Sequence, residues 1–235
     1  MLWTLKKCWY RIYQRVFKVA MCFMDWSAPQ LLEGAGSVLR LPELIKSKGV
    51  KKVLVVTDKG LIALHLLDPL FAKLDEVGIA YVVFDGVRPN PTIPCIEECK
   101  DMYVKNGCEG VIAFGGGSAM DCAKVAAARV VKPNQSVRAM RGQLKVHKKL
   151  PPLFAVPTTA GTGSEATPNA IVAVPEKQLK VGIVNTNNIE ETASVCRFAA
   201  EAAADGYEGY ACALTLDELS PEPFIHDFSN RRFLD

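Results

Sequence analysis

Apolar residues occur in short unbroken runs, and these runs alternate with longer segments that have helical periodicity. Four runs rich in β-branched and aromatic residues are typical of buried strands, at 53–56, 81–84, 111–114 and 153–156. Helical spacing follows or precedes them at 41–48, from 57–60 to about 77, at 94–106 and at 121–131. This alternation predicts an α/β fold, a Rossmann-like parallel sheet with helices on both faces.

The first 26 residues show a different pattern, that of an amphipathic helix. Four basic residues share one helical face, and five apolar residues share another. The basic face contains Lys7, Arg11, Arg15 and Lys18, and the apolar face contains Leu5, Trp9, Ile12, Val16 and Val19. We favour packing of this helix on the same protein or on a sister subunit. A membrane-surface helix is the alternative.

The last 46 residues also depart from the alternating pattern. They predict an acidic, Ala-rich helix over 190–204, followed by a polar end. We therefore divide the chain into an N-terminal amphipathic helix (1–27), an α/β domain (28–189) and a divergent helical remnant or tail (190–235).

Composition excludes several classes of protein. Hydrophobic residues make up 49% and charged residues 23% of the chain, as in globular proteins with a sizeable core. The net charge of +3 is too weak to indicate a nucleic-acid partner. The eight cysteines form no CxxC pair, which indicates reduced thiols in a cytoplasmic protein. No apolar run is long enough to cross a bilayer.

The most informative loop contains Gly115, Gly116, Gly117 and Ser118, between a predicted strand and a predicted helix. Glycines there let the backbone approach a bulky anion, and the first amides and the dipole of the helix favour a phosphate. The spacing matches neither the dinucleotide fingerprint nor a P-loop. Asp121 could cap the helix, and Lys124 could reach a phosphate or be solvated.

A second loop, at 157–165, follows the fourth predicted strand. Hydroxyl side chains and two glycines occur together in it, which suits phosphate, ribose and carboxamide groups. Its hydroxyl residues are Thr158, Thr159, Thr162 and Ser164. Asp58 and Asn90 follow two other strands, so all these loops are expected at the carboxyl edge of the sheet, where α/β proteins bind ligands.

Four segments together resemble the iron-containing, group III alcohol dehydrogenases. They read GGGSAMDCAK from Gly115, PTTAGTGSEAT from Pro157, VVTDKG from Val55 and PNPT from Pro89. The resemblance implies a dehydroquinate synthase-like nucleotide domain that binds NAD(P), followed in the family by a helical domain with a divalent metal, usually iron or zinc. It implies hydride transfer between an alcohol and an aldehyde or ketone.

The same resemblance assigns the cofactor-binding residues. It implies that the glycine loop holds the pyrophosphate and that Asp58 meets the adenosine ribose, which favours NAD over NADP because an acid repels a 2′-phosphate. The full set is Asp58, Asn90, Gly115, Gly116, Gly117, Ser118, Asp121, Thr158, Thr159, Thr162, Asn169 and Lys180. The partners implied are a nicotinamide dinucleotide and, in full-length relatives, a small alcohol or aldehyde.

The resemblance fails at the metal site. The family uses an aspartate and three histidines from its helical domain, whereas His226 is the one histidine after Val184 here. The positions expected for the first two ligands fall near Leu214 and Glu218. We therefore predict that this chain carries mainly the cofactor-binding half and holds no iron or zinc. A catalytically inactive dinucleotide-binding module and an interaction protein are the alternatives, and apolar surface left by a missing domain would suit a homodimer.

Overall fold

The computed structural model describes residues 2–22, 30–32, 34, 36–143, 145–146, 148–159, 162–175, 179–184 and 192–196. Most of the predicted tail, with Leu214, Glu218 and His226, therefore lies outside the described residues. Ala160 and Gly161 of the threonine-rich loop lie outside them too.

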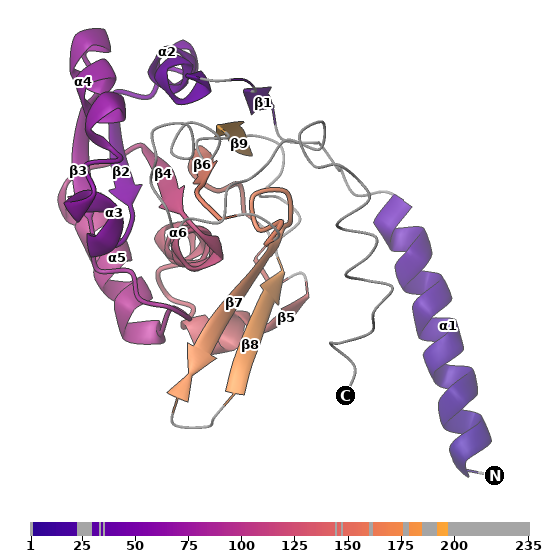
Figure 1. Cartoon of the computed structure of the whole chain (residues 1–235). Helices are drawn as coiled ribbons and strands as arrows, with labels where there is room; N and C mark the ends of the chain where they lie inside the picture. The colour runs from indigo at the N-terminus through magenta and orange to yellow at the C-terminus, as the bar shows by residue number, and fades with distance from the viewer. Residues whose placement is uncertain are drawn as a thin grey trace, which may run out of the picture.

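Six parallel strands form the main sheet, which confirms the predicted α/β class (Figure 1). Their order across the sheet is β1, β9, β6, β4, β2, β3. The strands are β1 (Leu31–Leu32), β2 (Lys52–Val56), β3 (Ala80–Phe84), β4 (Gly110–Gly115), β6 (Leu153–Pro157) and β9 (Thr192–Cys196). The four strands predicted from apolar runs are β2, β3, β4 and β6, and they are consecutive in the sheet, in the order β6, β4, β2, β3.

The central strands are buried on both faces, because successive side chains point to opposite sides. In β2, Val53 and Val55 face one core, while Leu54 and Val56 face the other. One core lies beneath α2 (Leu41–Ser47), α3 (Lys59–Ala63) and α4 (Asp68–Val77). The other lies beneath α5 (Ile93–Lys105) and α6 (Gly117–Val131). Helices therefore cover both faces, as the continuous hydrophobicity of the strands requires.

A second, smaller sheet was not predicted. It contains β5 (Gly142–Gln143), β7 (Asn169–Val174) and β8 (Leu179–Val184), with β7 and β8 antiparallel. Short 3-10 helices at Ser37–Arg40 and Val137–Met140 complete the described elements. Strand β7 packs beside α6, and the β7–β8 hairpin extends beyond that helix in Figure 1.

The single helix predicted from 57–60 to about 77 is wrong, because the structure breaks it into α3 and α4. His65 has a φ of 56° between them, in the left-handed region that ends helices. Pro69 then lies in the first turn of α4. A proline ring is tolerated in the first turn of a helix but would disrupt a helix interior. A new helix therefore begins near Pro69, and α3 does not extend through it.

The predicted helix over 190–204 is wrong for the part that the structure describes. Thr192–Cys196 is a strand, β9, which pairs in parallel with β1 on one side and β6 on the other. Ladder bonds to two neighbouring strands outweigh the modest helix propensity of a segment that contains Thr192 and Val195.

The amphipathic helix exists as α1 (Leu2–Cys22), but it does not pack on the described residues of its own chain, which was one half of our favoured prediction; packing on a sister subunit stays a prediction. Its described apolar side chains are exposed, including Trp9 at 67% and Val16 at 64%. Figure 1 shows α1 standing apart from the two sheets and their helices. Across the described residues, the helices are too short or too polar to cross a bilayer.

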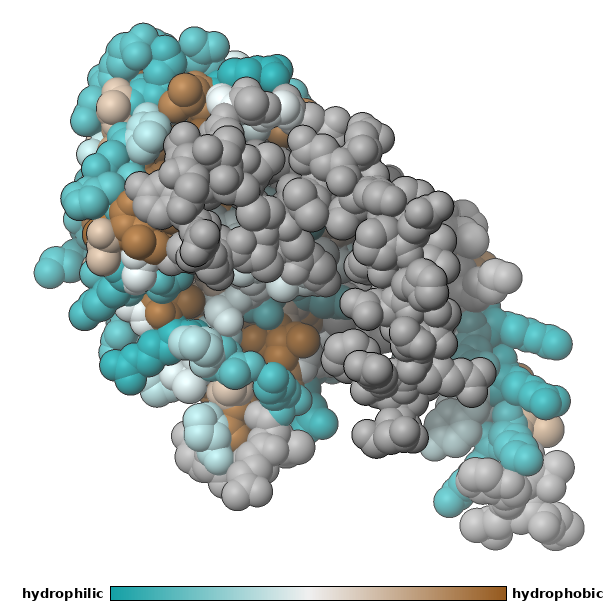
Figure 2. Space-filling view, in the orientation of Figure 1, coloured by the Kyte–Doolittle hydropathy of each residue, from teal (hydrophilic) through white to brown (hydrophobic). Residues whose placement is uncertain are grey.

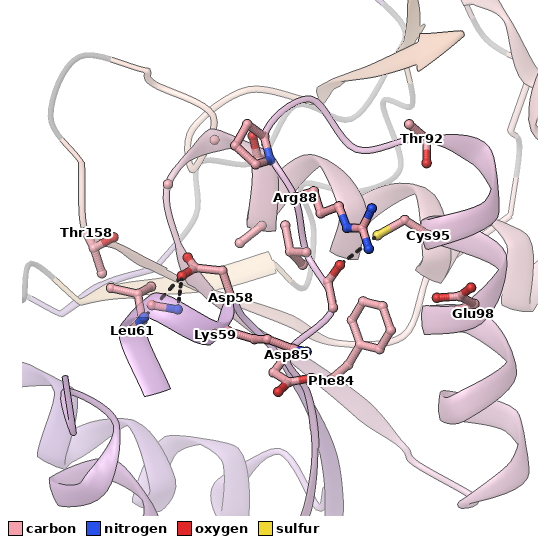
Figure 3. A pocket seen from close by; sticks show the side chains of 18 of the residues that line it. Asp58, Lys59, Leu61, Phe84, Asp85, Arg88, Thr92, Cys95, Glu98 and Thr158 are labelled. Atoms are coloured by element: carbon pink, nitrogen blue, oxygen red, sulfur yellow. Dashed lines mark hydrogen bonds between the residues drawn. The ribbon is translucent and has the colours of Figure 1, made fainter. Parts of the chain in front are cut away.

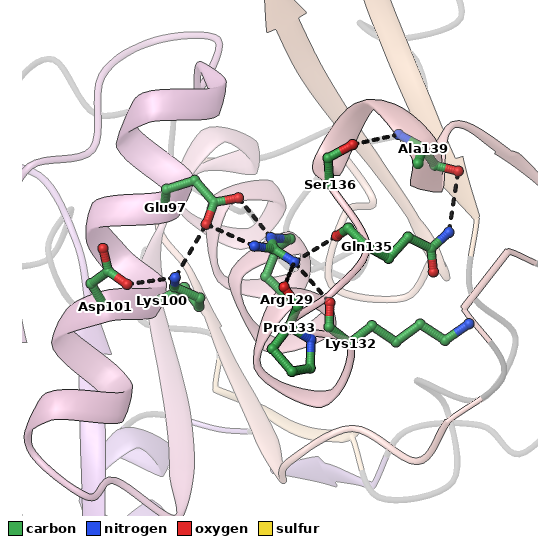
Figure 4. Close-up of polar contacts among 9 residues, drawn as sticks. All are labelled: Glu97, Lys100, Asp101, Arg129, Lys132, Pro133, Gln135, Ser136 and Ala139. Carbon is green, nitrogen blue, oxygen red and sulfur yellow. Dashed lines mark hydrogen bonds and ion pairs between the residues drawn. The ribbon is translucent and has the colours of Figure 1, made fainter.

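Arg129, near the end of α6, holds that helix against α5 (Figure 4). Its guanidinium donates to both carboxylate oxygens of Glu97, at 2.6 and 3.2 Å. It also donates to the carbonyls of Lys132, Pro133 and Gln135. Burial raises the pKa of Glu97, but the hydrogen bonds and charge of Arg129 outweigh it, so the net pKa is lowered. This cluster ties the connector after α6 to the domain.

Candidate nucleotide-binding cleft

The topology opens a crevice between β2 and β4, which are neighbouring strands. The chain leaves β2 through α3, on one face of the sheet, and leaves β4 through α6, on the opposite face. The two connections diverge at the carboxyl edge and leave space between them. Parallel sheets bind their ligands at such switch points. Asp58 follows β2 and the glycine loop follows β4, so both lie at this crevice.

A cavity of about 1080 Å³ opens at this edge (Figure 3). It lies between the segments that follow β2, β3, β4 and β6. Six predicted residues line it, namely Asp58, Gly116, Gly117, Ser118, Thr158 and Thr159. Charged residues that the sequence did not single out also line it, namely Lys59, Asp85, Arg88 and Glu98. Asp85 and Arg88 follow β3 directly, so the strand pattern could have indicated them.

The glycine loop is packed too closely for side chains. Gly115 has a φ of 148°, and an added Cβ there would lie 2.9 Å from the Cβ of Ala119. A Cβ on Gly116 would lie 2.8 Å from Oγ1 of Thr159. The Thr158 amide donates to the Gly115 carbonyl at 3.0 Å. The glycine and threonine loops are therefore in direct contact, and glycine is required where they meet.

Helix α6 begins at Gly117, four residues before the predicted start, and points its N-terminus into the cavity. The amides of Ala119 and Met120 donate to the Gly116 carbonyl. The amides of Gly117 and Ser118 precede these and have no helix carbonyl to donate to. They can therefore receive an anion, which the helix dipole favours.

Asp58 has a structural role in the described chain. Its Oδ1 accepts hydrogen bonds from the amides of Gly60 and Leu61, at 2.8 and 3.1 Å, and so caps α3 (Figure 3). Its Oδ2 lies 4.0 Å from the position of an added Cβ on Gly115. One carboxylate oxygen thus supports the helix, and the other lies beside the glycine loop.

Lys124 is buried and fastens the threonine-rich loop to α6. Its Nζ donates to the carbonyls of Ser164, Thr167 and Asn169, at 2.5, 2.8 and 2.9 Å. Burial lowers the pKa of Lys124 to about 8, although Asp121 and Glu165 oppose that shift. The expectations of a solvated lysine or a phosphate ligand are both wrong, because three carbonyls already use its three donors.

Asp121 does not cap α6, because the helix begins four residues earlier. Its Oδ1 accepts a hydrogen bond from Ser164 Oγ at 2.9 Å, on the side of α6 that meets the threonine-rich loop. Burial raises the pKa of Asp121, and hydrogen bonds from the Ile171 backbone and Ser164 and the charge of Lys124 oppose the shift. Asp121 thus lies behind the cavity rather than in its lining.

The remaining predicted residues lie near the cavity or away from it. Asn90, with a φ of 57°, donates its amide to Ser118 Oγ at 3.2 Å and so joins the proline-rich turn to the glycine loop. Thr162 lies beside Gly117, because a Cβ added to Gly117 would lie 3.5 Å from the Cβ of Thr162. Asn169 begins β7, and Lys180 lies exposed on β8. Neither Asn169 nor Lys180 lines the cavity.

The described side chains include His, Cys, Asp and Glu, which are possible metal ligands. No group of three or more His, Cys, Asp or Glu in that part of the chain could hold a metal ion. With no such group, the described residues do not fit a divalent metal. The free cysteines Cys95, Cys99 and Cys122 are buried, and a hydrogen bond with Cys122 together with burial raises the pKa of Cys95.

Comparison with known proteins gives one family. Residues 28–195 match the family model described as iron-containing alcohol dehydrogenase. A choline dehydrogenase from Bacillus subtilis is 35% identical over 161 residues, which are 67% of this chain and 40% of that protein.

Two solved structures are similar as well. An alcohol dehydrogenase from Oenococcus oeni has a TM-score of 0.68 and 35% identity, over 74% of this chain and 46% of that one. A sulfoacetaldehyde reductase from Bifidobacterium kashiwanohense in complex with NAD+ has a TM-score of 0.63 and 30% identity, with the same coverage. The chain therefore spans less than half the length of these relatives.

Proposed function

This chain belongs to the iron-containing alcohol dehydrogenase family, and we propose that it binds a nicotinamide dinucleotide in the cleft between β2 and β4. The observation that carries the proposal is the contact between two loops that follow β4 and β6. Thr159 leaves no room for a side chain at Gly116, while the N-terminus of α6 points into the cavity beside them. The similar reductase solved with NAD+ supports this choice of ligand.

Each end of the cofactor has candidate partners. The amides of Gly117 and Ser118, at the start of α6, would hold the pyrophosphate. Thr158 and Thr159 would lie along the diphosphate and the nicotinamide end, with Thr162 packed behind Gly117. Asn90 would lie at the adenosine end. Asn169 and Lys180 stay predictions from the resemblance, because neither lines the cavity.

Asp58 favours NAD over NADP in this proposal. Its Oδ1 is used to cap α3, which leaves Oδ2 to accept a hydrogen bond from a ribose hydroxyl. A phosphate on that ribose would meet a carboxylate held in place by the helix. Lys59 and Arg88 also line the cavity and would attract phosphate, so affinity for both cofactors must be measured.

The chemistry of the family extends beyond this chain. When bound, a nicotinamide accepts or donates the hydride that converts an alcohol to an aldehyde or ketone or back. The described residues would bind and orient that cofactor, and they offer no fitting metal site. We therefore propose that this chain binds NAD with little or no turnover. In full-length relatives, the metal-dependent step of the reaction would be carried out by the helical domain.

Titration calorimetry with NAD+, NADH and NADP+ tests the cofactor site. We expect Gly116→Asp to weaken NAD+ binding by at least about tenfold, because a Cβ would collide with Thr159 and the carboxylate would face the pyrophosphate. Gly182→Asp is the matched control. Gly182 lies in β8, away from the cavity, and a Cβ there meets nothing within 4 Å. Equal NAD+ affinity for Gly116→Asp and the unmutated chain would exclude this cleft.

Metal content and turnover test the second half of the proposal. We expect elemental analysis of the purified chain to find less than stoichiometric iron or zinc, and alcohols to produce no NADH. A stoichiometric metal together with alcohol-dependent NADH formation would contradict the proposed lack of turnover. That result would leave the cofactor site standing, because the calorimetric comparison tests it separately.

A further inference from the structure

Helix α1 is strongly basic. It contains five basic residues, Lys6, Lys7, Arg11, Arg15 and Lys18, and no acidic residue. The other residues contain 23 basic and 25 acidic side chains, because five of the 28 basic and none of the 25 acidic residues lie in α1. The net charge of α1 is therefore +5. Residues 28–189 contain 20 basic and 14 acidic side chains, and residues 190–235 contain 3 basic and 10 acidic ones.

The helix separates this charge from a broad apolar face. At 100° per residue, apolar and aromatic positions occupy an arc of about 200°, interrupted at Lys6, and the other four basic positions lie on the opposite arc. The exposed large apolar and aromatic side chains of α1 are Trp9, Tyr10, Ile12, Tyr13, Val16 and Val19. Figure 2 shows hydrophilic side chains projecting from the same helix.

Two properties of α1 favour a bilayer over a second copy of the chain. A two-helix contact buries a narrow seam, whereas this apolar arc is much wider. A second α1 would bring more positive charge and no carboxylate to pair with it. Anionic lipid headgroups supply negative charge on all sides of a helix that lies in the interface, and aromatic rings such as Trp9 and Tyr10 prefer that depth.

We propose that α1 binds the surface of membranes that contain anionic lipid, with its apolar face in the headgroup region and its basic face toward the phosphates. The helix lies on the bilayer and does not span it. Each basic residue near an anionic surface strengthens binding by about fivefold at moderate salt. Helix α1 would thereby hold the α/β domain at the membrane surface.

The full chain can be tested directly, because all three tryptophans, Trp3, Trp9 and Trp26, lie in or just after α1. Intrinsic fluorescence therefore reports this region alone. We expect vesicles of phosphatidylcholine with phosphatidylserine to co-sediment the chain and shift tryptophan emission to shorter wavelength. Vesicles of pure phosphatidylcholine should do so at least about tenfold more weakly, and added salt should weaken the binding.

Two double variants separate charge from the apolar face. Arg11→Glu with Arg15→Glu should lower affinity for anionic vesicles by more than about tenfold, because two positive charges become negative and the net charge of α1 falls by four. Ile12→Asp with Val16→Asp should abolish the emission shift. Lys145→Glu with Lys148→Glu makes the same charge change at exposed positions of the body and should have little effect.

Three results would overturn the proposal. They are equal binding to neutral and anionic vesicles, no binding by the unmutated folded chain, and loss of binding in the Lys145 and Lys148 control. Analytical ultracentrifugation tests the alternative, in which a second copy of the chain covers the apolar face of α1. If the chain is a dimer that Ile12→Asp with Val16→Asp converts to monomer, and it fails to bind vesicles, the apolar face is a contact between copies.

Discussion

Replacing Lys124 by methionine tests whether one buried ammonium holds the threonine-rich loop against α6. Lys124 is 5% exposed, and its Nζ donates to carbonyls of Ser164, Thr167 and Asn169. Methionine has a similar length and no donor, so the carbonyls would lose their partner without a large cavity. The loop should loosen while the helix remains.

The size of the effect follows from two opposing terms. Three hydrogen bonds from a charged donor contribute about 1.5 kcal/mol or more each, or roughly 5 kcal/mol. Burial lowers the pKa of Lys124 from 10.5 to about 8, which corresponds to a cost of about 3 kcal/mol for keeping the charge at neutral pH. The net loss expected for Lys124→Met is therefore about 2 kcal/mol of unfolding free energy.

The pH dependence of this difference is a sharper test. Below about pH 8 the lysine is charged in both states, and above pH 10.5 it is neutral in both. Between these values the unfolded chain binds more protons, so the unfolding free energy rises with pH. The stability of the unmutated chain relative to Lys124→Met should therefore grow by up to about 3 kcal/mol across this range, because the variant lacks the group.

Urea denaturation at pH 7 and at about pH 9.5 measures this difference, since other titrating groups cancel between the two proteins. Lys105→Met, at an exposed position on α5, is the control and should change neither value appreciably. Calorimetry with NAD+ should show about tenfold weaker binding for Lys124→Met, because Thr158 and Thr159 lead into the loosened loop. Unchanged stability and unchanged NAD+ affinity together would refute the anchoring role.

Two further predictions concern the layer between α5 and α6. Arg129→Met should lower the unfolding free energy by about 3 kcal/mol, because Glu97 loses both hydrogen bonds and three connector carbonyls lose a donor. Urea denaturation measures this, and a loss below about 1 kcal/mol would contradict it. In the native chain, Cys8 should react with a thiol reagent much faster than Cys95 and Cys122. A hydrogen bond with Cys122 and burial raise the pKa of Cys95. For Cys122 the hydrogen bond with Cys95 lowers the pKa, but a hydrogen bond with Cys99 and burial outweigh it, so the net pKa is raised, whereas Cys8 is exposed. Mass-spectrometric mapping checks this, and equal labelling rates would contradict it.

The sequence predicted the elements that follow local rules. Each apolar run from 53 to 156 became a strand because both its faces are covered, which needs no knowledge of distant residues. The glycine loop was identified because three consecutive glycines lie between a predicted strand and a predicted helix. The structure gives the reason for them, since side chains at Gly115 and Gly116 would collide with Ala119 and Thr159. The helix break at His65 was not predicted, although Pro69 is a local signal for it, since a proline seldom lies inside a helix.

Other features depend on contacts between distant segments, and local patterns do not contain them. Lys124 looks like a solvated helix residue until a loop forty residues later places three carbonyls around it. Asp121 looks like a cap until the start of α6 is fixed by the packing of Gly116 against Thr159. Thr192–Cys196 has mixed propensities and forms a strand because it pairs with β1 on one side and β6 on the other.

The position of β9 also bears on how self-contained the cofactor cleft is. This strand lies between β1 and β6, on the side of the sheet away from the β2–β4 crevice. The cavity lining runs from Asp58 to Thr159, and it rests on β2, β3, β4 and β6, which adjoin one another. The core beneath this cleft also includes Leu41 and Ile45 of α2, and Lys124 is held by carbonyls of Thr167 and Asn169. The lining of the cleft thus lies within residues 58–159, whereas its support extends from α2 to the start of β7.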